Sequence, residues 1–124
     1  MDENTLPQDV VAFVRLHIAS VPHLEVLISM IRSGDERFSA TDLAARTNLT
    51  PAVAASAAAD LVRSGLLTAE GSGYRFAPAT EVLNSVSASL AGCYDRFPVQ
   101  LIRLIYEPRS AVQSFADAFR LKKE

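Results

Sequence analysis

Two helix start signals close together in the chain constrain its fold more than any other feature of the sequence. Ser39 and Asp42 have the spacing of a capping box, in which each side chain accepts a hydrogen bond from the backbone N–H of the other residue. Thr50 is followed by Pro51, and proline is favoured at the first helical position because its missing N–H is not required there. Two short helices joined by a tight turn are typical of a helix-turn-helix. The predicted helices span residues 40–47 and 51–64, and residues 48–49 form the turn between them.

After Gly65 the periodicity changes from helix to strand. Residues 66–69 and 74–77 have the composition of two short strands, and Gly71 and Gly73 lie between them, where a hairpin turn requires positive φ angles. A helix-turn-helix followed directly by a β-hairpin is a winged helix, so the predicted fold is mainly α with a small β-hairpin wing. Apolar residues at helical spacing predict five flanking helices, over residues 8–19, 22–33, 80–97, 98–106 and 109–121.

The composition suits one domain with a real core, since 49% of the 124 residues are hydrophobic and 21% are charged. Cys93 is the one cysteine, which excludes an internal disulfide framework. The acidic N-terminus is unlike the basic start of a signal peptide, and no apolar run reaches the roughly 18 residues that span a bilayer. These features predict a cytoplasmic protein without a membrane partner. We divide the single domain, residues 1–124, into an N-terminal helix (8–21), the winged helix-turn-helix (22–77) and a C-terminal helical extension (78–124).

The net charge of −2 is spread unevenly along the chain. Residues 1–37 carry three basic and six acidic groups, whereas residues 96–124 carry six basic and three acidic groups. Residues 38–77 carry three arginines and three acidic residues, so this segment is neutral. Dedicated DNA-binding domains usually have a basic surface that neutralises phosphates. The predicted helix-turn-helix lacks that excess of basic residues.

The segment FSATDLAARTNLTPAVAASAAADLVRSGLLTAEGSGYRF, residues 38–76, resembles the winged helix-turn-helix domains of bacterial transcriptional regulators. It has their order of a short strand, a positioning helix, a turn, a recognition helix that ends in Gly-Leu, and a wing. The resemblance covers about a third of the chain, plus the preceding helix 22–33. It implies a regulator that binds double-stranded DNA through Thr50, the outward face of the recognition helix and the wing tip at residues 71–73. The C-terminal residues 93–124 resemble no family of known function.

The alanine-rich recognition helix leaves two interpretations open. Helical spacing places Ala54, Ala57, Ala58 and Leu61 toward the core, and five other residues outward: Ala52, Ala55, Ser56, Ala59 and Asp60. Alanine contacts only a thymine methyl group in the major groove, whereas Arg and Asn bind base edges by hydrogen bonds. The helix therefore either recognises DNA by shape and methyl contacts, or is alanine-rich for helix propensity and close packing, as in a winged helix that docks a protein partner. The candidate DNA contacts are Arg46, Thr50, Ala52, Ala55, Ser56, Ser72 and Arg75. Among these, Arg46 and Arg75 are the candidates for phosphate contacts, because strand alternation places Arg75 outward.

Two apolar stripes in the C-terminal extension are candidates for homodimerisation. The first is Leu83, Val86, Leu90, Cys93 and Phe97, and the second is Val112, Phe115, Ala116 and Phe119. In winged-helix regulators the helix after the wing often forms the dimer, and paired subunits match two DNA half-sites. The alternative for the first stripe is packing against helices 8–19 and 98–106 of the same chain, and the alternative for the second is docking under the helix 83–97 of its own chain.

Signals for catalysis, metal or cofactor binding are weak. His17 and His23 are six residues apart without an acidic neighbour that completes a known ligand spacing. Cys93 lies on an apolar stripe, where a small buried hydrophobic residue is the usual outcome. The glycines at 71 and 73 lie in a hairpin and not between a strand and a helix, as a phosphate-binding loop requires. The sequence therefore predicts a protein that is not an enzyme and that holds no metal or cofactor.

Overall fold

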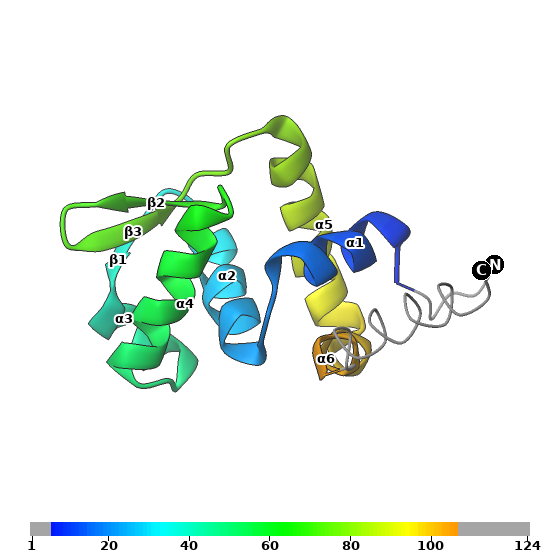
Figure 1. The fold of residues 1–124 in the computed structure, drawn as a ribbon, viewed down its shortest axis with the longest axis horizontal. Helices are drawn as coiled ribbons and strands as arrows, with labels where there is room; N and C mark the ends of the chain where they lie inside the picture. The colour runs from blue at the N-terminus through cyan, green and yellow to red at the C-terminus, as the bar shows by residue number, and fades with distance from the viewer. Residues whose placement is uncertain (1–5, 107–124) are drawn as a thin grey trace, which may run out of the picture.

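The winged helix predicted for residues 22–77 is present, and its elements follow in the predicted order (Figure 1). The structure is a computed structural model that describes residues 6–106. Its winged helix consists of α2 (Val21–Ser33), β1 (Arg37–Ser39), α3 (Ala40–Thr47), α4 (Pro51–Arg63), β2 (Leu67–Glu70) and β3 (Gly73–Phe76). Three further helices flank it: α1 (Gln8–His17), α5 (Glu81–Arg96) and α6 (Pro98–Tyr106). The predicted helix 109–121 lies outside the described residues.

The predicted caps explain where α3 and α4 begin. The backbone N–H of Asp42 donates to Ser39 Oγ at 3.1 Å, and the N–H of Ser39 donates to Asp42 Oδ2 at 3.3 Å, so the capping box is confirmed. Asn48 has a φ of 61°, and this left-handed conformation turns the chain between the two helices. Thr50 Oγ1 then accepts a hydrogen bond from the N–H of Val53 at 3.2 Å and starts α4.

The wing differs from the predicted hairpin in the bounds of its strands, each of which lies one residue closer to the turn. Its strands are residues 67–70 and 73–76, and the three-stranded antiparallel sheet has the order β1-β3-β2. Gly71 has a positive φ of 59°, as the turn requires, but Gly73 does not. Gly73 is buried opposite Ser39, and a Cβ atom there would lie 3.0 Å from the carbonyl oxygen of Phe38. The second glycine therefore permits close approach of β1, and the prediction that it supplies a positive φ was wrong.

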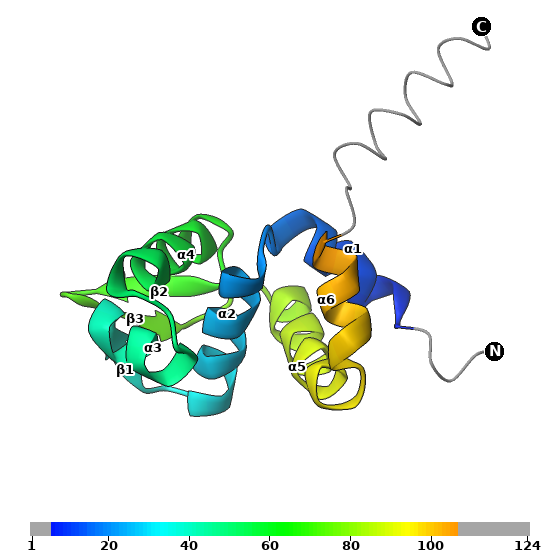
Figure 2. The same ribbon diagram turned by 90° about the horizontal axis from the view of Figure 1, so that it is seen from below.

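Helices α1, α5 and α6 form a layer on the side of α2 that faces away from α4 and the wing (Figures 1 and 2). α1 ends at His17, two residues earlier than predicted, because Ile18 turns to extended backbone and buries its side chain. The core of this layer includes Val14, Leu90 and Leu101, each 1% exposed or less.

The apolar stripe predicted along residues 83–97 packs inside this layer. Val86, Leu90 and Cys93 are buried, and Leu83 and Phe97 are partly buried against the same core. The structure thus shows the intramolecular alternative for this stripe, because α1 and α6 both pack on α5. Leu83 and Val86 of the stripe also line a groove at the surface between α1 and α5.

Across residues 6–106, no single helix is long and apolar enough to cross a bilayer. Helices α1 and α2 reach that length and composition only as a pair, which is bent by 116°.

Candidate nucleic-acid interface

The recognition helix α4 exposes a narrow face of small side chains. Ala54, Ala57, Ala58 and Leu61 are each 2% exposed or less, so the predicted buried face is confirmed. On the opposite side Ala52 and Ser56 are exposed, as predicted, whereas Ala55 and Ala59 are half-buried. Val53 is 40% exposed beside them, which the sequence pattern did not indicate. The exposed face consists of a capping threonine, alanine, valine, serine and, at the end of the helix, Arg63.

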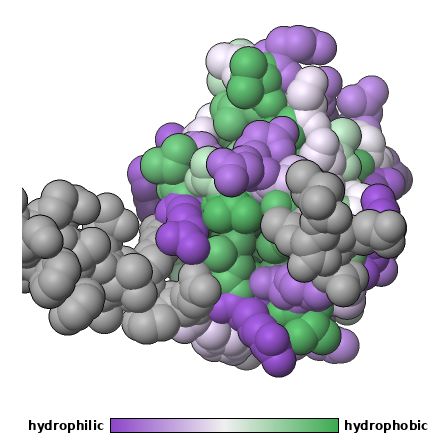
Figure 3. Space-filling model, turned by 90° about the vertical axis from the view of Figure 1, so that its right-hand side faces the viewer, coloured by the Kyte–Doolittle hydropathy of each residue, from purple (hydrophilic) through white to green (hydrophobic). Residues whose placement is uncertain are grey.

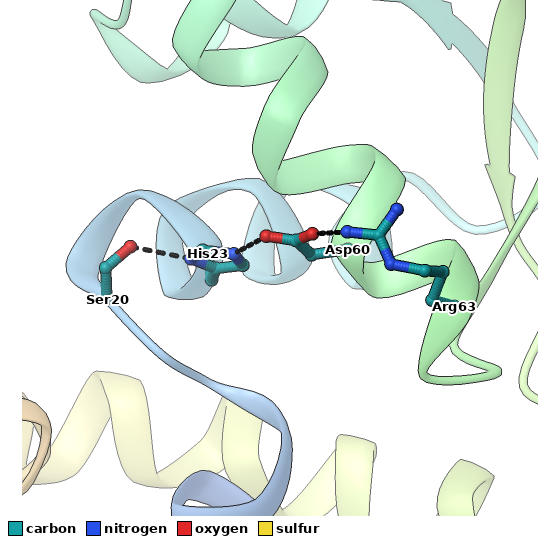
Figure 4. Close-up of polar contacts among 4 residues, drawn as sticks. All are labelled: Ser20, His23, Asp60 and Arg63. Atoms are coloured by element: carbon teal, nitrogen blue, oxygen red, sulfur yellow. Dashed lines mark hydrogen bonds and ion pairs between the residues drawn. The ribbon is translucent and has the colours of Figure 1, made fainter. Parts of the chain in front are cut away.

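Asp60 was predicted to point outward from this face, and in the structure two side chains hold its carboxylate (Figure 4). His23 Nε2 lies 2.7 Å from Asp60 Oδ2, and the guanidinium of Arg63 pairs with Asp60 Oδ1. Ser20 Oγ lies 2.6 Å from His23 Nδ1. A carboxylate accepts, so Nε2 carries the proton and neutral His23 accepts from the Ser20 hydroxyl at Nδ1. Burial lowers the pKa of His23.

Ser20, His23 and Asp60 are also the residue types of a hydrolase triad, but they are connected the other way round. In that triad the serine binds Nε2 and the aspartate binds Nδ1 of the histidine. Here the serine is on Nδ1 and is the residue that precedes α2. The arrangement suits a structural link between α2 and α4.

Arg46, a predicted phosphate contact, lies at the end of α3 and is exposed. Its guanidinium carbon is 4.6 Å from the centroid of the Phe38 ring, an arrangement typical of a cation–π contact. Its Nε and Nη2 donate to the hydroxyls of Ser29 and Ser33 at 3.3 and 3.4 Å. These contacts orient the side chain without neutralising its charge.

Arg75, the other predicted phosphate contact, forms an ion pair within the wing. Its Nε and Nη2 donate to Glu70 Oε2 at 2.8 and 2.6 Å. In the register of the hairpin Glu70 lies opposite Gly73, so Arg75 is two residues further along on the same face of the sheet. The hydrogen bond from Arg75 is the largest cause of a lowered pKa for Glu70. Ser72 is exposed at the tip of the wing, as predicted.

Removing this pair is expected to change the titration of Glu70. Arg75→Gln should raise the pKa of Glu70 toward its ordinary value, and a ¹³C NMR titration of the side-chain carboxyl would measure the change. Because the folded-state pKa is lowered, the stabilising contribution of the pair is present above the unfolded-state pKa and is lost as the pH falls through the folded-state pKa. Arg63→Gln is the matched control, since Arg63 pairs with Asp60. A Glu70 titration that is the same without Arg75 would contradict the assignment.

A polar cavity of about 360 Å³ lies where α2 and α3 meet α5. Tyr94 Oη donates to Glu25 Oε2 at 2.8 Å, and the guanidinium of Arg32 lies over the Tyr94 ring at 5.3 Å. Burial, followed by the hydrogen bond to Glu25, raises the pKa of Tyr94. These contacts join the winged helix to the flanking helices.

An apolar groove of about 440 Å³ runs between α1 and the first two turns of α5. Figure 3 shows the side of the molecule that carries these helices, where hydrophobic side chains gather in an exposed patch. Leu16 and Val82, both lining the groove, are each 75% exposed. Asp9 and Glu81 add negative charge to the lining.

In the part of the chain from residue 6 to 106, no three His, Cys, Asp or Glu side chains come close enough to hold a metal ion. His17 packs against Phe13, with ring centroids 5.1 Å apart, and burial lowers its pKa. Cys93 is buried, and burial is the largest cause of its raised pKa.

Comparison with known proteins identifies a similar fold. No family model matches the chain, and no curated protein does. A solved structure of a MarR family protein of Mycobacterium tuberculosis is similar with a TM-score of 0.50 and 13% sequence identity, over 96% of this chain and 86% of that chain. At this identity the likeness establishes the winged-helix fold, with its flanking helices.

Three features of the site were missed from the sequence. The acidic partner of His23 lies 37 residues further along the chain, so a search for acidic neighbours in sequence could not find it. Arg37 lies opposite Arg75 on a three-residue strand, which is too short to give a periodic signal. The groove of Leu16 and Val82 depends on how α1 and α5 pack, and no pattern within either helix indicates it.

Proposed function

We propose that this protein is a small winged-helix transcription regulator that binds double-stranded DNA as a homodimer. The observation that carries the proposal is the exposed face of α4, which starts at the capped Thr50, bears side chains small enough to let the helix backbone approach a groove, and ends at Arg63. The similar MarR family protein belongs to a family of winged-helix regulators, and this supports the same general role.

The exposed side chains divide into two kinds of DNA contact. Thr50, Ala52 and Ser56 would lie against base edges and thymine methyl groups in the major groove. Arg46 and Arg63, both exposed, and Ser72 at the wing tip would contact phosphates. Arg75 can contact a phosphate only if its ion pair with Glu70 breaks. We therefore expect it to contribute less to phosphate binding than the sequence suggested.

Binding to fragmented genomic DNA, measured over a salt series, tests the proposal. We expect binding that weakens with salt, with a log–log slope that becomes shallower by roughly 0.9 for each phosphate contact removed. Arg63→Ala should reduce the slope, whereas Arg103→Ala, which removes an exposed arginine on α6, should not. Absence of binding at low salt, or equal effects of the two variants, would contradict the proposal.

One observation favours a second function, namely docking of a protein partner on α4. The helix has no Lys, Arg, Asn or Gln before Arg63, and a smooth face of alanine suits close contact with another helix. Under this alternative the protein binds no DNA and binds a protein partner stoichiometrically. Ser56→Glu would then abolish binding of that partner. Salt-dependent DNA binding that Arg63→Ala weakens would exclude it.

The dimer of the proposed regulator would form through the apolar groove between α1 and α5. We infer that residues 110–121 of a second copy occupy it, because their sequence carries the apolar stripe of Val112, Phe115 and Phe119. The basic residues Arg120, Lys122 and Lys123 follow this stripe and complement the charge of Asp9 and Glu81 at the groove. The exchange is reciprocal in a twofold dimer, so each copy supplies one groove and one segment.

A further inference from the structure

The polar contacts around Asp60 place a partly buried histidine of α2 against a charge on the recognition helix (Figure 4). This link is formed among the described residues by Ser20 before α2, His23 on α2, and Asp60 and Arg63 on α4. The side chain of His23 is 13% exposed, that of Asp60 39% and that of Arg63 71%. Among these side chains the histidine is therefore the least exposed to solvent and the arginine the most exposed.

The side chain of Ser20 points toward His23 and does not cap α2. This residue occupies the N-cap position of α2, where a serine side chain commonly accepts from a backbone N–H of the first turn. Its side chain makes no such bond and lies 2.6 Å from His23 Nδ1. With Nδ1 held by Ser20, Nε2 is directed at Asp60 from the opposite side of the ring.

Asp60 would act against DNA binding if its carboxylate were free. It lies on α4 next to Ala59 and one turn before Arg63, at the edge of the face proposed to meet DNA. At physiological salt a charge acts over about 8 Å, so a carboxylate on a helix in a DNA groove is repelled by the phosphates. Contacts that keep the carboxylate on the α2 side therefore favour binding.

We propose that His23 is a positioning residue for DNA binding, which holds the Asp60 carboxylate against α2 and leaves Arg63 free to exchange that carboxylate for a DNA phosphate. The inference rests on the proposed function. When Arg63 moves to a phosphate, His23 remains as the partner of Asp60, so α4 keeps its place on α2. Protonation of His23 adds a positive charge to the link, and both Asp60 and nearby phosphates favour that charged form.

The groups around His23 fix the sign of the pH effect. From α4 these are Asp60 and Arg63, and from the segment before α2 the neutral Ser20. Helices α3 and α5 also contact α2, but at residues after His23. Arg46 of α3 bonds to Ser29 and Ser33. From α5, Tyr94 bonds to Glu25 and Asp95 pairs with Arg32. Burial lowers the pKa of His23, so this ring gains its proton at a lower pH than an exposed histidine does. DNA affinity should therefore rise as the pH falls through the pKa of His23.

The test is a double-mutant cycle of His23→Ala and Asp60→Asn, with DNA affinity measured at pH 8 and pH 5.5. His23→Ala should weaken binding by about ten- to a hundredfold, as expected for loss of a hydrogen bond to a charged group. In the Asp60→Asn background the same change should have little effect, since no carboxylate remains to be held. His23→Gln keeps a donor toward Asp60, so it should bind as the parent does at pH 8 but lose the gain at pH 5.5. Additive effects in the cycle, or a pH response that persists in His23→Gln, would overturn the proposal.

NMR titration of His23 in the DNA-free protein separates this inference from the proposed function. Asp60→Asn should lower the pKa of His23 further, because the carboxylate favours the imidazolium. If the parent protein binds no DNA, the proposed function fails, and an unchanged His23 titration in Asp60→Asn overturns the link itself. If the parent binds DNA and the cycle shows no coupling, the inference alone fails. Circular dichroism of each variant confirms that it is folded.

Discussion

Leu90→Ala is expected to lower the free energy of unfolding by about 2–5 kcal/mol, the usual cost of removing a leucine side chain from a packed core. Leu90 is fully buried in the middle of α5, a helix that contacts α1, α2 and α6. Its replacement leaves a cavity at the junction of the winged helix and the flanking helices. Chemical denaturation at fixed protein concentration measures the change.

Val82→Ala is the matched control for Leu90→Ala on the same helix. Val82 is 75% exposed, so its truncation should change the free energy of unfolding by less than about 0.5 kcal/mol. Because Val82 lines the groove between α1 and α5, the same variant should weaken dimerisation. A Leu90→Ala protein of unchanged stability that dissociates into monomers would contradict the intramolecular packing of the α5 stripe.

Replacing Phe115 and Phe119 together by alanine is expected to convert the dimer to a monomer. Burial of each ring is worth about 1.5–3 kcal/mol, and a reciprocal dimer buries four of them, so their loss should raise the dissociation constant by more than about 10⁴-fold. Sedimentation velocity over a concentration series measures the shift. The two rings lie at i and i+4 in the sequence pattern, on one face of the predicted helix 109–121.

Gln113→Ala is the control for this pair, because residue 113 lies on the opposite face of the same pattern and should leave the dimer unchanged. Asp9→Lys should also weaken the dimer, since it places a positive charge in the groove that receives a basic segment. An unchanged dimer with lowered thermal stability in the double alanine variant would show that the two rings belong to the core of their own chain.

Local chemistry explains why much of the winged helix was predictable. The cap at Ser39, the left-handed turn at Asn48 and the start of α4 at Thr50 each depend on contacts within four residues. The buried face of α4 was equally evident, because helical periodicity alone places Ala54, Ala57, Ala58 and Leu61 on one side. The prediction of a wing was confirmed, although its strands were displaced by one residue.

The properties of the candidate site depended on side-chain partners that helical and strand periodicity does not indicate. Asp60 was predicted to be an outward carboxylate, and only the packing of α2 on α4 brings His23 to within 2.7 Å of it. Arg75 was predicted to be an outward cation, but Glu70 was assigned to the turn, so its place beside Arg75 on the same face of the hairpin was not predicted. In both cases the sequence specified the charge, and the tertiary contact specified its partner.

The sequence by itself determined which helices and strands form, because caps, turns and apolar periodicity act through neighbouring residues. Only the tertiary structure decided what buries the apolar stripe of α5. Helix α5 is amphipathic whether its apolar stripe packs against α1 and α6 or against a second chain. In the structure α1 and α6 pack on this stripe, and Leu16 and Val82 remain at the surface. The physical reason is that an apolar face specifies burial but not the partner that buries it.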